Sequence, residues 1–200
     1  MCYNQGLVFQ PEIDINYGDL SFTTWSNISI WDKNSEMNNE VDFTLTYSKS
    51  IFNFDIESSL NYYYYFNEDD PNTAELSLKL SYPLGDFSLF TGLSVDILEN
   101  PGGIYDELGV EYEKEINDHW TIDGSVMTAM ASSKFNSYYL DVNKSAFNFI
   151  GLNATLTYSP LKDLHIDAHY QINQTLDEEL KNTLLGKNPN YFEVIFRKEF

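Results

Sequence analysis

The chain has 200 residues, a length that one domain can use in full, and it carries 31 acidic against 11 basic residues, for a formal net charge of -20. So few basic side chains could not neutralise the phosphates of a nucleic acid, which is therefore excluded as a partner, and the charge favours cationic partners. The single cysteine excludes an internal disulfide framework, no Cys/His spacing suggests zinc, and no cofactor is expected. Apolar residues never run on for about 18 positions, so no transmembrane helix is expected.

Apolar and polar residues alternate along most of the chain, which is the pattern of strands with one apolar face. In residues 40–47, for example, Val41, Phe43 and Leu45 fall on one face, while Asp42 and Thr44 fall on the other. Taken in chain order, the alternation predicts eleven strands, at 7–17, 20–31, 40–47, 51–66, 73–82, 87–96, 104–113, 119–131, 146–158, 164–174 and 191–200.

The connections between these strands alternate in length. Short connections are expected at 18–19, 48–50, 83–86, 114–118 and 159–163. Long connections are expected at 32–39, 67–72, 97–103, 132–145 and 175–190. Short periplasmic turns and longer extracellular loops are typical of outer-membrane barrels. The sequence therefore predicts an all-β protein, an antiparallel up-and-down transmembrane β-barrel of the bacterial outer membrane, in which residues 1–200 form a single domain surrounded by the lipid bilayer.

Aromatic residues make up 16% of the chain, which is more than a core requires. Each strand that enters a short connection has a tyrosine near its end, and the returning strand is expected to open with an aromatic or apolar residue, namely Phe22, Phe52, Phe87, Trp120 or Leu164. Aromatic belts at both membrane interfaces are typical of membrane proteins. The residues expected to form such a girdle are Tyr17, Trp31, Tyr47, Phe52, Tyr82, Phe87, Tyr112, Trp120, Tyr158 and Phe200.

The last predicted strand places Phe192, Val194, Phe196 and Phe200 on one face. This ending resembles the C-terminal signature that the barrel-assembly machinery recognises, although Lys198 stands where a hydrophobic residue is usual. With this end in the periplasm, the first strand runs downward from the outside. Bacterial single-chain barrels have an even number of strands, so we expect about 11 strands of a barrel of about 12, with a signal sequence and one upstream strand missing.

Two early segments of the chain carry distinctive motifs, Asn4-Gln5-Gly6-Leu7-Val8-Phe9-Gln10-Pro11-Glu12-Ile13-Asp14 and Phe22-Thr23-Thr24-Trp25-Ser26-Asn27. They resemble the early part of the TorF-type porins, which reach a Gln-Pro strand after a first strand and an extracellular turn, and then a Trp-Ser-Asn strand. The motifs cover about 25 residues, and the rest of the chain agrees only in its general β-barrel pattern. Membership of that family would imply an outer-membrane pore and a missing upstream strand, and it would imply no catalytic residue.

Acidic side chains dominate the face opposite the apolar one. The carboxylates expected in the lumen are Glu12, Asp14, Asp42, Asp55, Glu57, Glu75, Asp96, Glu107, Glu111, Glu113, Asp123, Asp167 and Glu193. The basic or titratable residues expected beside them are Lys79, Arg197, His165 and His169. Carboxylates crowded inside a barrel create a negative potential that concentrates cations. Alternatively, the polar side chains fill a narrow lumen through hydrogen bonds and salt bridges.

The leading interpretation is a porin-like channel, and not an enzyme, for passive diffusion of small hydrophilic solutes, cationic by preference or neutral. The first alternative is an outer-membrane barrel hydrolase. His165, Asp167 and His169 share one face of a strand, which would suit a hydrolase dyad or two metal ligands, but no serine in an elbow motif lies nearby. The second alternative is a soluble lipocalin-like barrel, in which the face of Val41 would be buried and not exposed.

Overall fold

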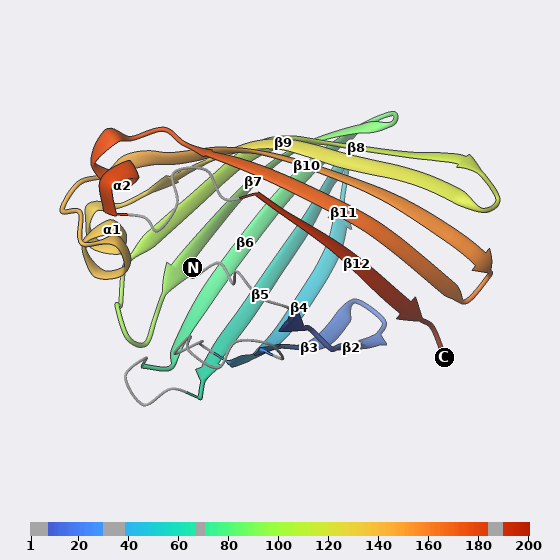
Figure 1. The fold of residues 1–200 in the computed structure, drawn as a ribbon, viewed down its shortest axis with the longest axis horizontal. Coiled ribbons are helices and arrows are strands. Elements are labelled where there is room, and N and C mark those ends of the chain that lie inside the picture. Colours follow the sequence, from blue (N-terminus) through green and yellow to red (C-terminus); the bar gives the residue numbers. More distant parts are fainter. Residues whose placement is uncertain (1–7, 30–38, 67–70, 184–189) are drawn as a thin grey trace.

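The computed structural model describes residues 8–29, 39–66, 71–183 and 190–200, which form one long antiparallel sheet with two short helices (Figure 1). The strands are β1 (Val8–Phe9), β2 (Glu12–Tyr17), β3 (Leu20–Ser29), β4 (Glu40–Ile51), β5 (Phe54–Tyr65), β6 (Thr73–Leu84), β7 (Phe87–Asp96), β8 (Ile104–Asn117), β9 (Trp120–Ala131), β10 (Ala146–Leu161), β11 (Leu164–Thr175) and β12 (Asn190–Lys198). The helices are α1 (Ser133–Leu140) and α2 (Glu178–Thr183). In this described part, no helix is long and apolar enough to cross a membrane.

The sheet is an up-and-down meander, as the alternating pattern predicted. From β3 to β12 each strand pairs antiparallel with the next one in the chain, and β1 and β2 both pair with β3. Figure 1 shows the strands side by side in this order, with a strong twist along the sheet. Across residues 8–29, 39–66, 71–183 and 190–200, no strand pairing joins β12 to β1 or β2.

The first predicted strand is two strands. Residues 7–17 were expected to be continuous, but the ladder breaks at Gln10 and Pro11 between β1 and β2. Proline has no backbone N–H, so it cannot donate a ladder hydrogen bond. The Pro11 carbonyl still accepts from Ser26 N at 3.0 Å, which keeps both pieces aligned on β3. The described residues therefore form twelve strands.

The short connections are tighter than predicted. Residues 48–50 were expected to turn, yet they belong to β4, and Ile51 pairs with Phe54. The turn itself is Phe52-Asn53, in which Phe52 has φ 56° and is 98% exposed. The expectation that Phe52 opens the returning strand is therefore wrong. The turns at Gly18 and Gly85 also use positive φ, which glycine adopts without the steric cost that a Cβ brings.

The two faces of the sheet differ in character and in exposure. Leu45 pairs with Leu60, and Leu60 pairs with Leu76, and these side chains are 43–51% exposed. On the other face, Thr44 pairs with Asn61, and both are half-buried. We call these the apolar face and the polar face. An open apolar face and a sheltered polar face are the arrangement of a membrane barrel, whereas a lipocalin-like barrel would bury the apolar face.

Three cross-strand aromatic pairs lie on the apolar face near the short turns. Their ring centroids are 4.7–5.2 Å apart, in the pairs Phe54–Tyr82, Phe87–Tyr112 and Trp120–Tyr158. Of the other predicted girdle residues, Trp31 lies outside the described residues, and Phe200 lies beyond the end of β12. That these rings contact lipid stays a prediction.

Both helices lie where only loops were predicted. In α1 the Ser132 hydroxyl caps the N-terminus by accepting from Phe135 N, and Asp141 ends the helix in the left-handed conformation. Asp177 caps α2 by accepting from the backbone N–H groups of Glu179 and Leu180. Figure 1 shows both helices at the end of the sheet that carries the long connections, which we call the long-loop end; the opposite end is the short-turn end.

Candidate functional site

The strand register places every predicted lumen residue on the polar face. One row across the sheet consists of Asp14, Thr23, Thr44, Asn61, Glu75 and Asp96. A second row consists of Glu57, Lys79, Gly92 and Glu107. A third row consists of Glu113, Asp123, Thr155, His169 and Glu193. Glu12 and Asp42 flank Trp25, Asp55 pairs with Ser81, Glu111 pairs with Ser88, and His165 pairs with Arg197. That these residues set selectivity stays a prediction.

Several of these carboxylates have hydroxyl groups as their hydrogen-bond partners. Thr23 Oγ1 donates to Asp14 at 2.5 Å, and Tyr63 OH donates to Glu75 at 3.1 Å. Ser50 Oγ donates to Asp55 at 2.5 Å. A hydroxyl stabilises a carboxylate by a hydrogen bond but brings no positive charge. These three carboxylates therefore have no positively charged partner among the hydrogen bonds described.

Positive charge on the polar face is sparse. Lys79 Nζ lies 2.7 Å from Glu111 Oε1, and Arg197 Nε lies 2.6 Å from Asp167 Oδ2. In the part of the chain that the structure describes, these are the basic residues of the strands on this face. The other basic strand residues lie on the apolar face at the short-turn end, each paired with a turn aspartate, as Lys49–Asp19, Lys114–Asp86 and Lys198–Asp163. The last pair accounts for Lys198, which departs from the usual C-terminal pattern.

Asp96, expected as a lumen carboxylate, is the centre of a buried network at the long-loop end. It is 1% exposed and accepts from Thr73 Oγ1 at 2.9 Å and from Tyr139 OH at 2.6 Å. The backbone N–H groups of Leu98 and Asn100 donate to its other oxygen at 3.0 Å. One carboxylate thus fixes the turn after β7 and connects it to α1.

Helix α1 covers the polar face at the long-loop end. Its Phe135 ring lies 5.4 Å from that of Tyr105, which shares a row with Ala131. Ala129 and Ala131, which lie on the polar face at this end of β9, are fully buried. The Asn136 side chain, also fully buried, exchanges two amide hydrogen bonds with Asn148. The helix therefore covers part of the polar face at the long-loop end.

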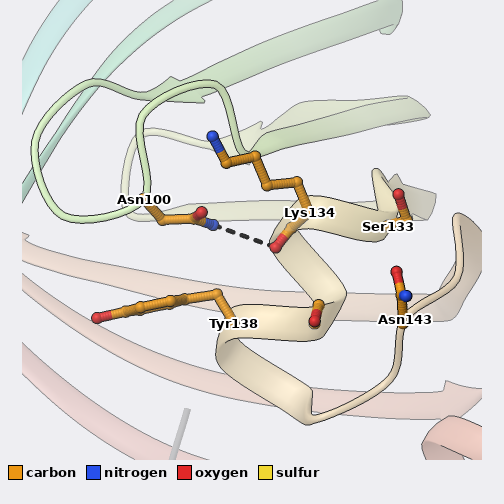
Figure 2. Close-up of a pocket in the computed structure, with 6 residues that line it drawn as sticks. Asn100, Ser133, Lys134, Tyr138 and Asn143 are labelled. Carbon is orange, nitrogen blue, oxygen red and sulfur yellow. Dashed lines mark hydrogen bonds between the residues drawn. The ribbon is translucent and has the colours of Figure 1, made fainter.

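A shallow recess of about 470 Å³ lies where α1 meets the turn after β7 (Figure 2). Its lining is polar, made of Asn100, Ser133, Lys134, Ser137, Tyr138 and Asn143. Asn100 Nδ2 donates to the Lys134 carbonyl at 3.3 Å and joins the turn to the helix. Partial burial and the neighbouring Glu99 carboxylate raise the pKa of Tyr138 to about 12, so its hydroxyl stays protonated and donates to Glu99 at neutral pH.

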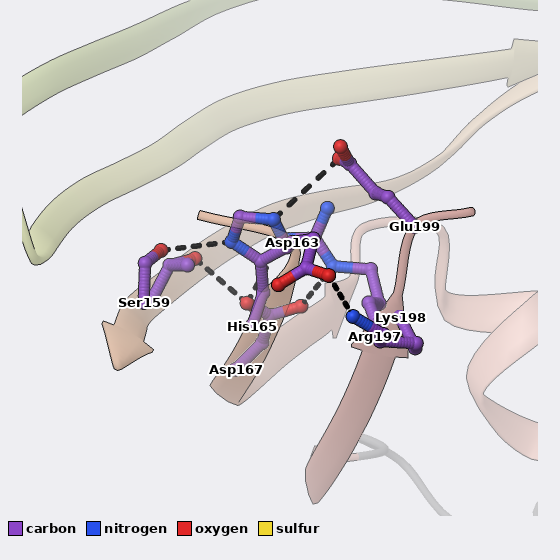
Figure 3. Close-up of polar contacts among 8 residues, drawn as sticks. Ser159, Asp163, His165, Asp167, Arg197, Lys198 and Glu199 are labelled. Carbon is purple, nitrogen blue, oxygen red and sulfur yellow. Dashed lines mark hydrogen bonds and ion pairs between the residues drawn. The ribbon is translucent and has the colours of Figure 1, made fainter. Parts of the chain in front are cut away.

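A second network joins β10, β11 and β12 at the short-turn end (Figure 3). Asp167 is 3% exposed and accepts from Thr157 Oγ1 at 2.8 Å. Arg197 donates to both of its oxygens, from Nε at 2.6 Å and from Nη2 at 3.0 Å. Two parallel bonds between a guanidinium and a carboxylate fix both groups. The negative charge of this predicted lumen carboxylate is therefore paired with a guanidinium, whereas Asp14 and Glu75 accept from hydroxyl donors.

The two histidines of the predicted cluster have separate partners. His165 Nδ1 lies 2.8 Å from Ser159 Oγ, whereas His169 Nδ1 lies 2.9 Å from Thr155 Oγ1. The carboxylate of Asp167, which lies between the two histidines in the strand, accepts a hydrogen bond from Arg197. Over the residues that the structure describes, no group of three His, Cys, Asp or Glu side chains is placed to hold a metal ion.

The hydrolase alternative would need Ser159 as its nucleophile, with His165 as the base. On the other side of the imidazole, His165 Nε2 is 3.5 Å from Glu199 Oε1, which is too long for a strong hydrogen bond. Ser159 lies within strand β10, and its backbone N–H donates to the His119 carbonyl at 2.8 Å. Acyl transfer requires hydrogen-bond donors that stabilise an oxyanion, and this N–H is not free to be one of them.

Sequence reasoning missed the tyrosines that hold the acids. Tyr63 lies in a run of four tyrosines, and its alternation with Asn61 places it on the polar face next to Glu75. The alternation of side chains along the strand was therefore enough to predict that Tyr63 lies on the polar face. Tyr139 lies on α1, so its contact with Asp96 depends on a helix that the alternation did not predict.

Comparison with known proteins defines the fold class. No known family model matches the chain, and no curated protein sequence matches it. The structure is similar to that of the NanC porin, with a TM-score of 0.66 over 96% of this chain and 92% of that chain, at 11% sequence identity. A Salmonella typhi OmpF complex with daunomycin aligns with a TM-score of 0.47 over 95% of this chain and 61% of that chain, at 13% identity.

The protein therefore has a porin-like antiparallel β-sheet fold, as the alternating sequence predicted. At 11% identity the likeness to NanC concerns the fold alone. The resemblance to the TorF-type porins rests on the Gln10-Pro11 and Trp25-Ser26-Asn27 motifs and stays a prediction.

Proposed function

We propose that this protein is a porin-like channel of the bacterial outer membrane, through which small hydrophilic solutes diffuse passively and cations pass more readily than anions. The polar face would line the pore, and the apolar face would contact lipid. The exposed leucines Leu45, Leu60 and Leu76 support this orientation, because burying apolar surface in the bilayer is favourable.

One observation carries the cation preference: several carboxylates of the polar face are held by neutral hydroxyls and not by basic side chains. Asp14, Asp55 and Glu75 accept hydrogen bonds from the hydroxyls of Thr23, Ser50 and Tyr63, which bring no positive charge to them. The basic side chains on this face are already committed to Glu111 and Asp167. A wall with net negative charge concentrates cations and repels anions.

The outer membrane would be reached through the barrel-assembly machinery, which we propose recognises β12. Its apolar face carries Phe192, Val194 and Phe196, which are 50–73% exposed and so remain available for contact. Lys198 is bound to Asp163 at the adjacent turn and does not interrupt this apolar stripe.

The test is a planar-bilayer recording of the purified full chain under a KCl gradient. We expect stepwise conductance and a reversal potential on the potassium side. Raising the salt should weaken the selectivity, because the Debye length falls from about 10 Å at 0.1 M to about 3 Å at 1 M. A protein that inserts but does not conduct, or one that prefers chloride, would contradict the proposal.

A further inference from the structure

A cavity of about 210 Å³ opens on the polar face across β4 to β8. At about 30 Å³ per water molecule, it has room for roughly seven waters, and so for one small solute. Its lining consists of Thr46, Glu57, Ser59, Ser77, Leu78, Lys79, Gly92, Leu93, Ser94 and Glu107. The cavity exists because Gly92 has no side chain in a row otherwise filled by Glu57, Lys79 and Glu107.

The hydroxyls of this cavity are arranged by one amide. Thr44 Oγ1 donates to Asn61 Oδ1 at 3.0 Å and fixes which way the amide points. Asn61 Nδ2 then donates to Ser59 Oγ at 3.3 Å and to Ser77 Oγ at 3.1 Å. Ser77 is in turn 2.8 Å from Ser94 Oγ. Because Ser59 accepts from Asn61, its own hydroxyl proton is directed elsewhere, and a solute hydroxyl in the cavity would be a suitable acceptor.

The charges at the cavity rim favour a cation. Lys79 is opposite Glu57 in the register, but its ammonium group lies 2.7 Å from Glu111 and 4.7 Å from the centre of the Phe90 ring. Among the described residues no basic side chain forms an ion pair with Glu57, which lines the cavity. Glu107 adds a second carboxylate beside Gly92. The rim therefore has an excess of negative charge next to an ordered set of hydroxyls.

We infer that this cavity is a binding site for a small hydroxylated solute with a cationic group, of the amino-sugar or amino-alcohol class. The serine hydroxyls exchange hydrogen bonds with the hydroxyls of the solute, and Glu57 binds its ammonium group. The inference rests on the proposed function for its biological meaning, because a site on the pore wall selects among the solutes that pass. Binding itself does not require conduction, so the two are separable by experiment.

The test measures binding of three probes to the detergent-solubilised full chain by isothermal titration calorimetry. The probes are glucosamine, glucose and glucuronate, which share a hydroxylated ring and differ in charge. We expect glucosamine to bind at least tenfold more tightly than glucose, and glucuronate more weakly than glucose. Equal affinity for glucosamine and glucose would overturn the inference.

Two variants locate the site. Glu57→Gln should reduce the affinity for glucosamine to that for glucose and leave glucose binding unchanged. Gly92→Leu should weaken both at least tenfold, because its side chain would fill the cavity. Thr121→Leu places the same leucine side chain on the polar face near the short-turn end, outside the cavity, and should change neither. If glucosamine binding is insensitive to Glu57→Gln and Gly92→Leu, the cavity is not the site.

Two further results keep the inference separate from the proposed channel. If Gly92→Leu lacks the circular dichroism spectrum of a folded sheet, the Ser59→Ala and Ser94→Ala variants replace it, and each should weaken glucose and glucosamine binding to a similar degree. A protein that binds glucosamine in this way but does not conduct contradicts the channel and upholds the site. A cation-selective channel without glucosamine binding contradicts the site alone.

Discussion

Tyr139 on α1 donates a 2.6 Å hydrogen bond to the buried Asp96 carboxylate at the end of β7. The two residues are far apart in the chain, and their contact holds a helix of one loop against the turn of another. Because α1 covers the polar face here, the bond would set how wide this end of the proposed pore is. Its strength follows from its chemistry, since hydrogen bonds to charged groups contribute about 1.5–3 kcal/mol.

Tyr139→Phe should therefore lower the free energy of unfolding by about 1.5–3 kcal/mol and loosen α1. We expect larger and noisier single-channel conductance in bilayer recordings, together with a lower midpoint of thermal unfolding. Tyr138→Phe is the matched control, because the Tyr138 hydroxyl contacts the exposed Glu99 and lies outside the Asp96 network. Equal effects of the two substitutions would show that Asp96 does not anchor the helix.

Leu78→Arg should impair insertion or stability, because Leu78 is 41% exposed on the apolar face. An arginine near the bilayer midplane costs about 2–4 kcal/mol on the lipid side of a barrel. Ser77→Ala, one residue earlier and on the polar face, should be mild. Folding into lipid vesicles, followed by heat-dependent gel mobility, measures both. Normal assembly of Leu78→Arg with failure of Ser77→Ala would reverse the assignment of the two faces.

Arg197 and its neighbour Lys198 should differ sharply on replacement by glutamine. Arg197→Gln leaves the buried Asp167 carboxylate without its cation, and because the Arg197 side chain is 51% exposed, the loss should be below that of a fully buried pair, at about 1–3 kcal/mol. Lys198→Gln breaks a pair with Asp163 in which both side chains are about half exposed, so it should change stability very little. Urea unfolding of the two variants measures the difference. Similar urea midpoints would mean that the Asp167 network contributes no more to stability than the exposed Lys198–Asp163 pair.

The contact between Asp177 and Lys144 should depend on pH. The hydrogen bond from Lys144 lowers the pKa of the Asp177 carboxyl, and the N–H groups at the start of α2 lower it further. A depressed pKa contributes stability that is present above the ordinary aspartate pKa of about 3.9 and is lost as the pH falls through the folded value. The amide resonances of Glu179 and Leu180 should move in that acidic range. In Asp177→Asn, which keeps a capping oxygen without the charge, they should not.

The strands and the two faces could be predicted because a strand places successive side chains on opposite sides whatever its partner is. The alternation around Phe43 and Leu45 was therefore sufficient for β4. The end of β4 was predicted wrongly, since Ser48-Lys49-Ser50 has the composition of a turn but pairs with β5. The physical turn is two residues later, at a Phe52 whose positive φ no propensity indicates.

The helices and the networks of the candidate site were harder to foresee. Helix α1 has eight residues, and helices shorter than about 12–15 residues are marginal unless tertiary contacts support them. Those contacts, from Tyr139 to Asp96 and from Asn136 to Asn148, join residues that only the folded sheet brings together. The face of the sheet on which each residue lies was predictable. Which carboxylates accept hydrogen bonds from hydroxyls, and which one binds Arg197, was not.

The charge of the polar face should set the ion selectivity of the pore. Replacing Asp42, Asp55 and Glu75 together with Asn, Asn and Gln removes three carboxylates from this face and should shift the reversal potential toward the anion side. The backbone pairing that holds the sheet does not involve these side chains, so the circular dichroism spectrum should stay unchanged. The measurement is the reversal potential in a KCl gradient, at low and at high salt.

The matched control removes the same number of charges elsewhere, by replacing Asp19, Asp86 and Asp163 with asparagine. These aspartates lie in the short turns and pair with lysines on the apolar face, so they do not face the pore that we propose. Their loss should leave the reversal potential within error of the unmodified protein, whereas net charge alone would predict the same shift from both triple variants. If both sets shift the potential equally, selectivity arises from the net charge of the whole protein. If neither shifts it, the ions do not pass along the polar face.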